Sequence, residues 1–127
     1  MLPSFLVPET TVREAGNGSE LNLGESKGRL VLLTLGITRI IEQESLDVSI
    51  WGSMDGQEWG AKPLIVFPQK LYCGTSQILL DLSPHPDVRF LRVKWAAQRW
   101  GKGNSQPLFG FYVFAQELKQ QLLAASA

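Results

Sequence analysis

One strand-and-turn stretch, residues 45–59, constrains the fold more than any other part of this chain. Apolar residues occupy every second position from Leu46 to Ile50, and a period of two is typical of a strand that turns one face toward a core. Asp55 and Gly56 follow the run, and an Asp-Gly pair supplies the positive backbone dihedral of a tight turn. The stretch therefore predicts a half-buried strand that leads directly into a turn.

The side chains of the turn suggest how it is held. Ser53 and Asp55 are short enough to accept hydrogen bonds from backbone N–H groups of the same turn. We expect Gly56 to adopt a positive φ and Trp59 to fold back over the turn, where burial of an indole is worth at least about 2 kcal/mol. We interpret this segment as a structural device rather than a ligand site.

The length of the chain is that of one domain, and its cysteine content gives no sign of a disulfide-stabilised fold. A chain of 127 residues can bury roughly two thirds of its unfolded surface around one core. Its single cysteine, Cys73, allows no intramolecular disulfide and no paired-thiol zinc or redox motif, and we expect it to be a small buried hydrophobe. We predict a single domain over 1–127, with an N-terminal arm or edge strand over 1–13.

The rest of the chain reads as short apolar runs separated by turn residues. Residues 29–41 are apolar on both faces, which predicts a central strand, and residues 63–68 are fenced by prolines, which predicts an edge strand. Residues 88–97 predict another strand with alternating faces. Seven or eight strands at this spacing predict an all-β fold, an antiparallel β-sandwich of jelly-roll type. Residues 115–125 favour a short C-terminal helix.

A resemblance agrees with this fold class. The motif Ser53-x-Asp55-Gly56-x-x-Trp59, the later run 88–93 (VRFLRV) and the closing strand 109–114 (FGFYVF) resemble discoidin-type (coagulation factor 5/8 C) and related galactose-binding-like jelly rolls over roughly residues 30–116. The same hairpin is similar to small phage and prophage virion-associated β-sandwich proteins. The resemblance implies the fold but carries over no sugar or lipid site. That family's N-terminal ligand-bearing segment, with its tryptophan and paired cysteines, has no counterpart here.

The sequence contains few residues in patterns typical of catalysis or cofactor binding. His85 is the single histidine, and it lies between two prolines with no nucleophile close in sequence. The acidic residues Glu42 and Glu44 fall in a turn, where solvation explains them. The chain has no Gly-rich phosphate loop and no series of metal ligands. We therefore predict a protein that is not an enzyme, has no cofactor and has no metal-binding residues that the sequence identifies; whether a structural calcium is bound stays open.

The charges of the chain are balanced in total but not along its length. Residues 1–60 carry nine acidic and four basic side chains, whereas residues 61–127 carry three acidic and eight basic ones. Either the two halves interleave in one domain and the imbalance disappears, or the surface is bipolar and favours head-to-tail self-association. A net charge of zero argues against nucleic-acid binding, which needs a basic excess.

The N-terminus has no basic region, and its apolar run is short and broken by prolines, so it is unlike a signal peptide. No stretch approaches the roughly 20 apolar residues that a membrane span needs. We expect no membrane span and take the cytoplasm as the default location. A virion-associated location and export by a non-classical route stay open.

Two functions of different classes follow from these patterns. The first is a non-catalytic structural or assembly module that packs against copies of itself or a protein partner. The second is a carbohydrate-binding module, because an aromatic face beside a guanidinium can grip a sugar ring. The candidate assembly contacts are Phe5, Val7, Arg92 and Lys94, and the candidate residues for a glycan ligand are Trp95, Arg99, Trp100 and Lys102.

Overall fold

The computed structural model describes residues 3–23, 30–40, 44–69, 72–99 and 108–118. These residues form nine strands and no helix. The strands are β1 (Ser4–Val12), β2 (Gly16–Asn17), β3 (Leu21–Asn22), β4 (Leu30–Ile40), β5 (Glu44–Ser53), β6 (Ile65–Val66), β7 (Gly74–Asp81), β8 (Phe90–Arg99) and β9 (Phe109–Leu118). The number exceeds the seven or eight predicted because the described part includes three strands, β2, β3 and β6, of only two residues each.

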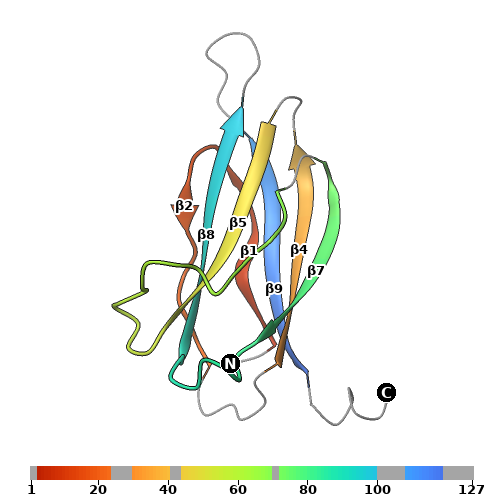
Figure 1. Ribbon diagram of the computed structural model, residues 1–127. Helices are drawn as coiled ribbons and strands as arrows, with labels where there is room; N and C mark the ends of the chain where they lie inside the picture. Colours follow the sequence, from red (N-terminus) through yellow and green to blue (C-terminus); the bar gives the residue numbers. More distant parts are fainter. Residues whose placement is uncertain (1–2, 24–29, 41–43, 70–71, 100–107, 119–127) are drawn as a thin grey trace.

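The strands pair into two sheets. Strands β1, β9, β4 and β7, in this order, form the four-stranded sheet; β2, β8, β5 and β6 form the second sheet, in which β3 also pairs with β8. Every pairing is antiparallel. Figure 1 shows the two sheets as adjacent layers, with their long strands running along the long axis and β7 at the outer margin of the view. The all-β, antiparallel, two-sheet prediction is confirmed.

The hydrophobic core lies between the two sheets and takes side chains from both. The alternation predicted for β5 is present, since Leu46, Val48 and Ile50 are at most 1% exposed. Every second residue of β4, β8 and β9 points into the same core. The core-facing residues of these three strands are Val31, Leu33, Leu35, Ile37, Leu91, Val93, Phe109, Phe111, Val113 and Ala115.

Two strand positions predicted from the sequence pattern are confirmed. β4 lies between β9 and β7, and both of its faces are shielded: Leu33 on the core side is 0% exposed and Thr34 on the other side is 9% exposed. β6 follows Pro63 and precedes Pro68, and it is the last strand of the second sheet. Prolines are tolerated at such a margin because an edge strand leaves half of its N–H groups unpaired.

The C-terminal helix predicted over 115–125 is wrong for its first four residues. β9 continues to Leu118, and Ala115 lies opposite Leu33 in the ladder with β4 and is 0% exposed. The helix propensity of this segment is weak compared with a full ladder of hydrogen bonds to a central strand, so tertiary context decides. The other predicted helical positions, 119–125, lie outside the described residues.

The N-terminal segment forms an edge strand rather than a free arm. β1 is the first strand of the four-stranded sheet and pairs with β9. The register shifts on either side of Val7, which lets two successive residues, Leu6 and Val7, both point inward at 2% and 4% exposure. A bulge of this kind bends the strand and interrupts its ladder.

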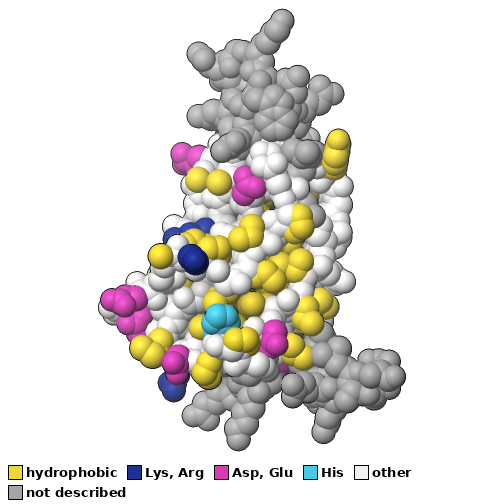
Figure 2. Space-filling view, viewed as in Figure 1, with side chains coloured by type: hydrophobic (Ala, Val, Ile, Leu, Met, Phe, Trp, Pro, Cys, Tyr) yellow, Lys and Arg dark blue, Asp and Glu magenta, His cyan; other side chains and the backbone are white. Residues whose placement is uncertain are grey.

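Side chains of both charges are interspersed on the surface. In Figure 2, Lys and Arg gather at one flank of the view, and Asp and Glu lie both above and below them. β5, from the acidic half of the sequence, pairs with β8, from the basic half, along ten positions. This pairing places strands from the two halves of the sequence side by side in one sheet. Within the described ranges, no helix is long and apolar enough to cross a membrane.

Candidate functional site

The turn after β5 is held by its own side chains, as predicted. The Ser53 hydroxyl accepts from the N–H of Gly56 at 2.9 Å and from the N–H of Asp55 at 3.3 Å. Oδ1 of Asp55 accepts from the N–H groups of Gln57 at 2.8 Å and Glu58 at 3.0 Å. Gly56 has a φ of 80°. The carboxylate is thus occupied by the turn, and the segment has a structural role.

Replacing Asp55 with alanine should destabilise the protein at neutral pH, and the loss should shrink on acidification. The N–H groups of Glu58 and Gln57 hold the pKa of Asp55 below its ordinary value of 3.8. A carboxylate with a lowered folded-state pKa stabilises the fold above the unfolded pKa and loses that effect as the pH falls through the folded value. Thermal unfolding of wild type and variant at pH 7 and at about pH 3 measures the difference.

A control for that experiment is Asp81→Ala. The N–H of Ser83 donates to Oδ1 of Asp81 at 2.9 Å and lowers the pKa of this carboxyl as well. In each single variant, the contribution of the replaced carboxylate to the loss of stability at low pH should disappear, and the contribution of the other carboxylate should remain. A stability difference between Asp55→Ala and wild type that stays constant over the whole pH range would contradict the account.

Two indoles and two cations alternate on the outer face of the second sheet. Nζ of Lys94 lies 4.0 Å from the ring centroid of Trp51, and the guanidinium carbon of Arg92 lies 4.6 Å from that of Trp59. Among the described residues the Nε of Arg92 is buried with no hydrogen-bond partner. A cation over an indole at an exposed site contributes about 0.5–1 kcal/mol. These four residues, the indole–cation ladder, bind the turn to β8, with Trp59 under Arg92.

A shallow hollow of about 410 Å³ lies beside Lys94 on the same side of the molecule. Its lining includes Asp47 as well as Lys94, so the two charges oppose each other. Pro63 and Val66, from the segment around β6, close it on one side. This mixture gives the hollow no preference for an anion or a cation.

The outer face of the four-stranded sheet has a different character. The strand register places Phe5 of β1, Phe114 of β9, Thr34 of β4 and Gln77 of β7 in one row across the sheet. The ring of Phe5 meets that of Phe114 at 4.8 Å between centroids, and Phe5 is 50% exposed. We call this surface the aromatic face, and it consists of Phe5, Thr34, Gln77, Leu79, Tyr112, Phe114 and Gln116.

A second hollow, of about 470 Å³, lies in the middle of the aromatic face. It forms because small side chains of β4 stand between the aromatic residues of β9 and the longer residues of β7. Gln77 donates to the hydroxyl of Thr34 at 3.2 Å at its floor. Gly36 allows the ring of Tyr112 to lie across β4, since a Cβ at this position would come within 2.3 Å of that ring.

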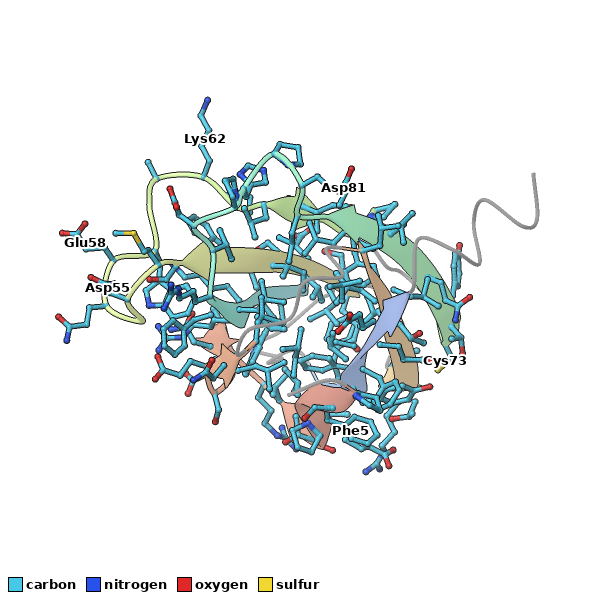
Figure 3. The ribbon with its side chains drawn as sticks, turned by 90° about the horizontal axis from the view of Figure 1, so that it is seen from below. Phe5, Asp55, Glu58, Lys62, Cys73 and Asp81 are labelled. Atoms are coloured by element: carbon cyan, nitrogen blue, oxygen red, sulfur yellow. The ribbon has the colours of Figure 1, made fainter. Side chains whose placement is uncertain are left out.

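The aromatic face carries little charge. Of the residues that line its hollow in the described part of the chain, Glu9 is the one with a charge, and it belongs to the edge strand β1. Leu79 is 43% exposed on β7. Figure 3 shows Phe5 and Cys73 on the side of the four-stranded sheet and Asp55 and Glu58 on the opposite side, so the aromatic face and the turn are separate surfaces.

The candidate glycan residues fall mostly outside the described part. Trp95 packs against the core, with its ring 5.4 Å from that of Phe111, and its Nε1 donates to the carbonyl of Glu14 at 3.0 Å. Arg99 ends β8, and its side chain lies outside the described residues, as do the residues of the loop that contains Trp100 and Lys102. The structure therefore describes the side chain of only one member of this proposed platform.

The candidate assembly residues are distributed over both sheets. Phe5 is exposed on the aromatic face, whereas Val7 is 4% exposed and belongs to the core, so it has no surface to offer a partner. Arg92 and Lys94 lie on the outer face of the second sheet, within the indole–cation ladder. A single flat surface of a partner protein therefore cannot contact Phe5 together with Arg92 and Lys94.

Sequence reasoning missed the other members of the aromatic face. The sequence pattern assigns Tyr112 and Phe114 only to a last strand, although β9 carries apolar side chains at successive positions from Phe111 to Phe114. A run that is apolar on both faces is the same signal that identified β4 as a covered strand. In β9 the same signal indicates that the outward-pointing residues Tyr112 and Phe114 are apolar, and both are partly exposed.

The groups with catalytic chemistry are scattered. Cys73 is exposed in the connection before β7, so the prediction that it is buried is wrong; it precedes the first paired residue of β7, and its neighbours Tyr72 and Gly74 are exposed as well. His85 is exposed in its loop. Among the described residues, no three His, Cys, Asp or Glu side chains lie close enough together to hold a metal ion.

No protein-family model, no curated protein and no solved structure matches this chain. The likeness to discoidin-type domains and to phage virion proteins therefore rests on the motif residues themselves. What the structure supports is an antiparallel two-sheet fold of a kind compatible with a β-sandwich.

Proposed function

We propose that this protein is a non-catalytic assembly module that packs against a second copy of itself through the aromatic face. One observation carries the proposal: the aromatic face is nearly uncharged and exposes large apolar side chains, with Phe5 50% and Leu79 43% exposed. Large apolar side chains exposed on one face of a sheet are typical of protein interaction sites. The indole–cation ladder lacks this property, because each cation already covers an indole.

The charge of the aromatic face favours a second copy as the partner. A two-fold contact brings the same surface of both copies together, so every charge on it would meet a like charge or need a partner within the same patch. Thr34, Gln77, Tyr112 and Phe114 on this face are uncharged, and Glu9 stands at the β1 margin. Two copies can therefore meet here without like-charge repulsion.

The size of the sheet sets the expected strength of the contact. Four strands about 4.8 Å apart and about eight residues long span roughly 500 Å², or about 1,000 Å² for two copies. Stable specific interfaces bury about 1,200–2,000 Å² in total. We therefore expect a dimer that dissociates on dilution rather than an obligate one.

The strand order supports the finer fold assignment, a jelly roll. The first and last long strands, β1 and β9, are neighbours in one sheet, and connections such as β4 to β5 and β8 to β9 pass from one sheet to the other. Such crossing connections are expected of a double-sheet jelly roll built from two Greek keys. This topology leaves β1 and β7 as the two margins of the four-stranded sheet.

Replacing Phe5 with serine should abolish the dimer at concentrations where wild type associates. The substitution removes the most exposed ring of the aromatic face, which also packs on Phe114 and Tyr112. Sedimentation velocity over a concentration series measures the dissociation constant, and we expect it to rise by about tenfold or more, because a few large aromatic side chains carry most of the binding energy of such contacts.

Val66→Ser is the matched control. Val66 is 52% exposed, close to Phe5 in exposure, but it lies on β6 of the second sheet. This variant should associate as wild type does. Equal weakening by both substitutions would show that general hydrophobicity, and not the aromatic face, drives association, and the proposal would fall.

A further inference from the structure

The two margins of the four-stranded sheet are protected to different degrees. β1 contains Pro8, which has no N–H to donate, and its ladder shifts in register at two places, on either side of Val7. It also carries the charge of Glu9. Prolines, bulges and charges are the devices by which natural sheets prevent pairing at an edge.

β7 has none of these devices along most of its length. Its residues 74–80 include no proline and no charged side chain, and Asp81 is its last residue. It pairs with β4 at eight successive positions without any shift in register. No strand of the described residues pairs with its other side, and Figure 1 shows it at the outer margin. Along residues 74–80, β7 thus presents an uninterrupted, uncharged row of backbone groups that no described strand pairs with, which is a template for another strand.

We propose that β7 pairs antiparallel with β7 of a second copy, so that two four-stranded sheets join into one of eight strands. The inference rests on the proposed function, since it defines a further contact between copies. The edge and the aromatic face are different surfaces of the same sheet, so one contact does not block the other. Leu79, 43% exposed, lies on β7 where the two surfaces meet.

Symmetry limits how two β7 strands can meet. In an antiparallel pair, residues that lie opposite each other point to the same side of the sheet. Two identical strands related by a two-fold axis must therefore have one residue that lies opposite its own copy, and the axis passes between these two residues. An axis at Gln77 pairs residues 74–80, and an axis at Ile78 pairs residues 75–81; these two registers use the most of the strand. The register with its axis at Gln77 contains no charged side chain, whereas the register with its axis at Ile78 places Asp81 opposite Thr75.

A second copy fits this edge better than an unrelated peptide. The two-fold axis places the same strand opposite itself, so this edge contact by itself joins only two chains. The other margin, β1, is interrupted, so it cannot continue the sheet into a fibre. An edge that was meant for a charged peptide would carry opposite charges to select it, and β7 has none before Asp81.

Cysteine cross-linking tests the pairing and its register. In the full chain with Cys73→Ser, the variants Thr75→Cys, Gln77→Cys and Leu79→Cys each place one thiol on the outer side of β7. If the axis lies at Gln77, the Gln77→Cys variant forms a disulfide with a second molecule of the same variant. A mixture of the Thr75→Cys and Leu79→Cys variants then forms a disulfide between the two different variants. With the axis at Ile78, the mixture of Gln77→Cys and Leu79→Cys cross-links instead. Directly opposite residues come close enough for a disulfide.

The control is Thr11→Cys in the same background, which places an exposed thiol on the other margin, β1. Under mild oxidation, the matching β7 positions should yield at least about tenfold more covalent dimer than Thr11→Cys, because pairing raises the local thiol concentration. Cross-linking that is equal at all positions, or absent from all of them, would overturn the inference. Circular dichroism confirms that each variant is folded.

The same experiment separates this inference from the proposed function. Wild type that forms dimers while no β7 position cross-links would overturn the edge pairing and leave the aromatic face as the contact. A β7 cross-link that persists in a Phe5→Ser background would support the edge pairing and show that it does not need the aromatic face. Wild type that stays monomeric at every concentration, with no cross-link, would contradict both.

Discussion

Replacing Phe111 with alanine should lower the free energy of unfolding by about 3–5 kcal/mol, the largest effect that we expect from a single substitution. Phe111 is 0% exposed, and its ring packs edge-to-face on Trp95 at 5.4 Å between centroids. Its removal leaves a cavity where β9 faces the second sheet. Because domains are stable by only about 5–15 kcal/mol, the variant should be close to unfolding at 37 °C.

Urea denaturation of Phe111→Ala beside Phe114→Ala measures this loss with an internal control. Phe114 is on the same strand three residues later and has the same side chain, but it points to the aromatic face and is only partly buried. We expect Phe114→Ala to cost less than half as much, because its position opens to solvent rather than to a cavity. Equal losses would mean that β9 is not oriented as described.

The second large effect concerns a buried carboxylate. Glu44 is 2% exposed at the start of β5, and its Oε1 accepts from the N–H of Leu108, just before β9, at 2.8 Å. The bond connects the two sheets at one end of the molecule. Glu44→Ala should cost about 1–3 kcal/mol, because the N–H of Leu108 is then left without its acceptor.

Glu44→Gln separates the hydrogen bond from the charge. The glutamine carbonyl can still accept from Leu108, so this variant should keep most of the stability that Glu44→Ala loses. Thermal unfolding of the three proteins at neutral pH gives the comparison. If Glu44→Gln and Glu44→Ala lose the same amount of stability, the hydrogen bond to Leu108 is not the interaction through which Glu44 stabilises the fold.

The sequence predicted those parts of the fold that depend on local periodicity. The alternation in β5 and β8, the two covered faces of β4 and the proline-bounded margin at β6 are all present. The turn residues Ser53, Asp55 and Gly56 behave as their chemistry requires. Each of these features depends on neighbouring residues, which is why a single sequence suffices to predict it.

The features that the sequence did not predict depend on distant partners. Ala115 lies in a strand because β4 pairs with it, although its own segment favours a helix. Glu44 is buried because Leu108, 64 residues later, offers an N–H to it, whereas its neighbours suggested a solvated turn. Cys73 is exposed because it stands just outside a ladder. Tertiary contacts decide all three positions.

The candidate site was predicted only in part for the same reason. Phe5 was chosen from an apolar run near the N-terminus, and it is exposed; Val7, from the same run, is not. A bulge in β1 reverses the side to which Val7 points, and no local pattern reveals it. The aromatic face gathers residues from β1, β4, β7 and β9, and only their register brings them into one row.

The central claim, self-association through the aromatic face, is tested most directly by the mass of wild type in solution. Light scattering after size exclusion, at low and at high salt and at two protein concentrations, measures it. We predict a mass above one chain of 14.1 kDa that falls on dilution and persists at high salt, because apolar contacts are not screened. A mass of one chain under all four conditions would contradict the account, as would an assembly that dissolves in salt.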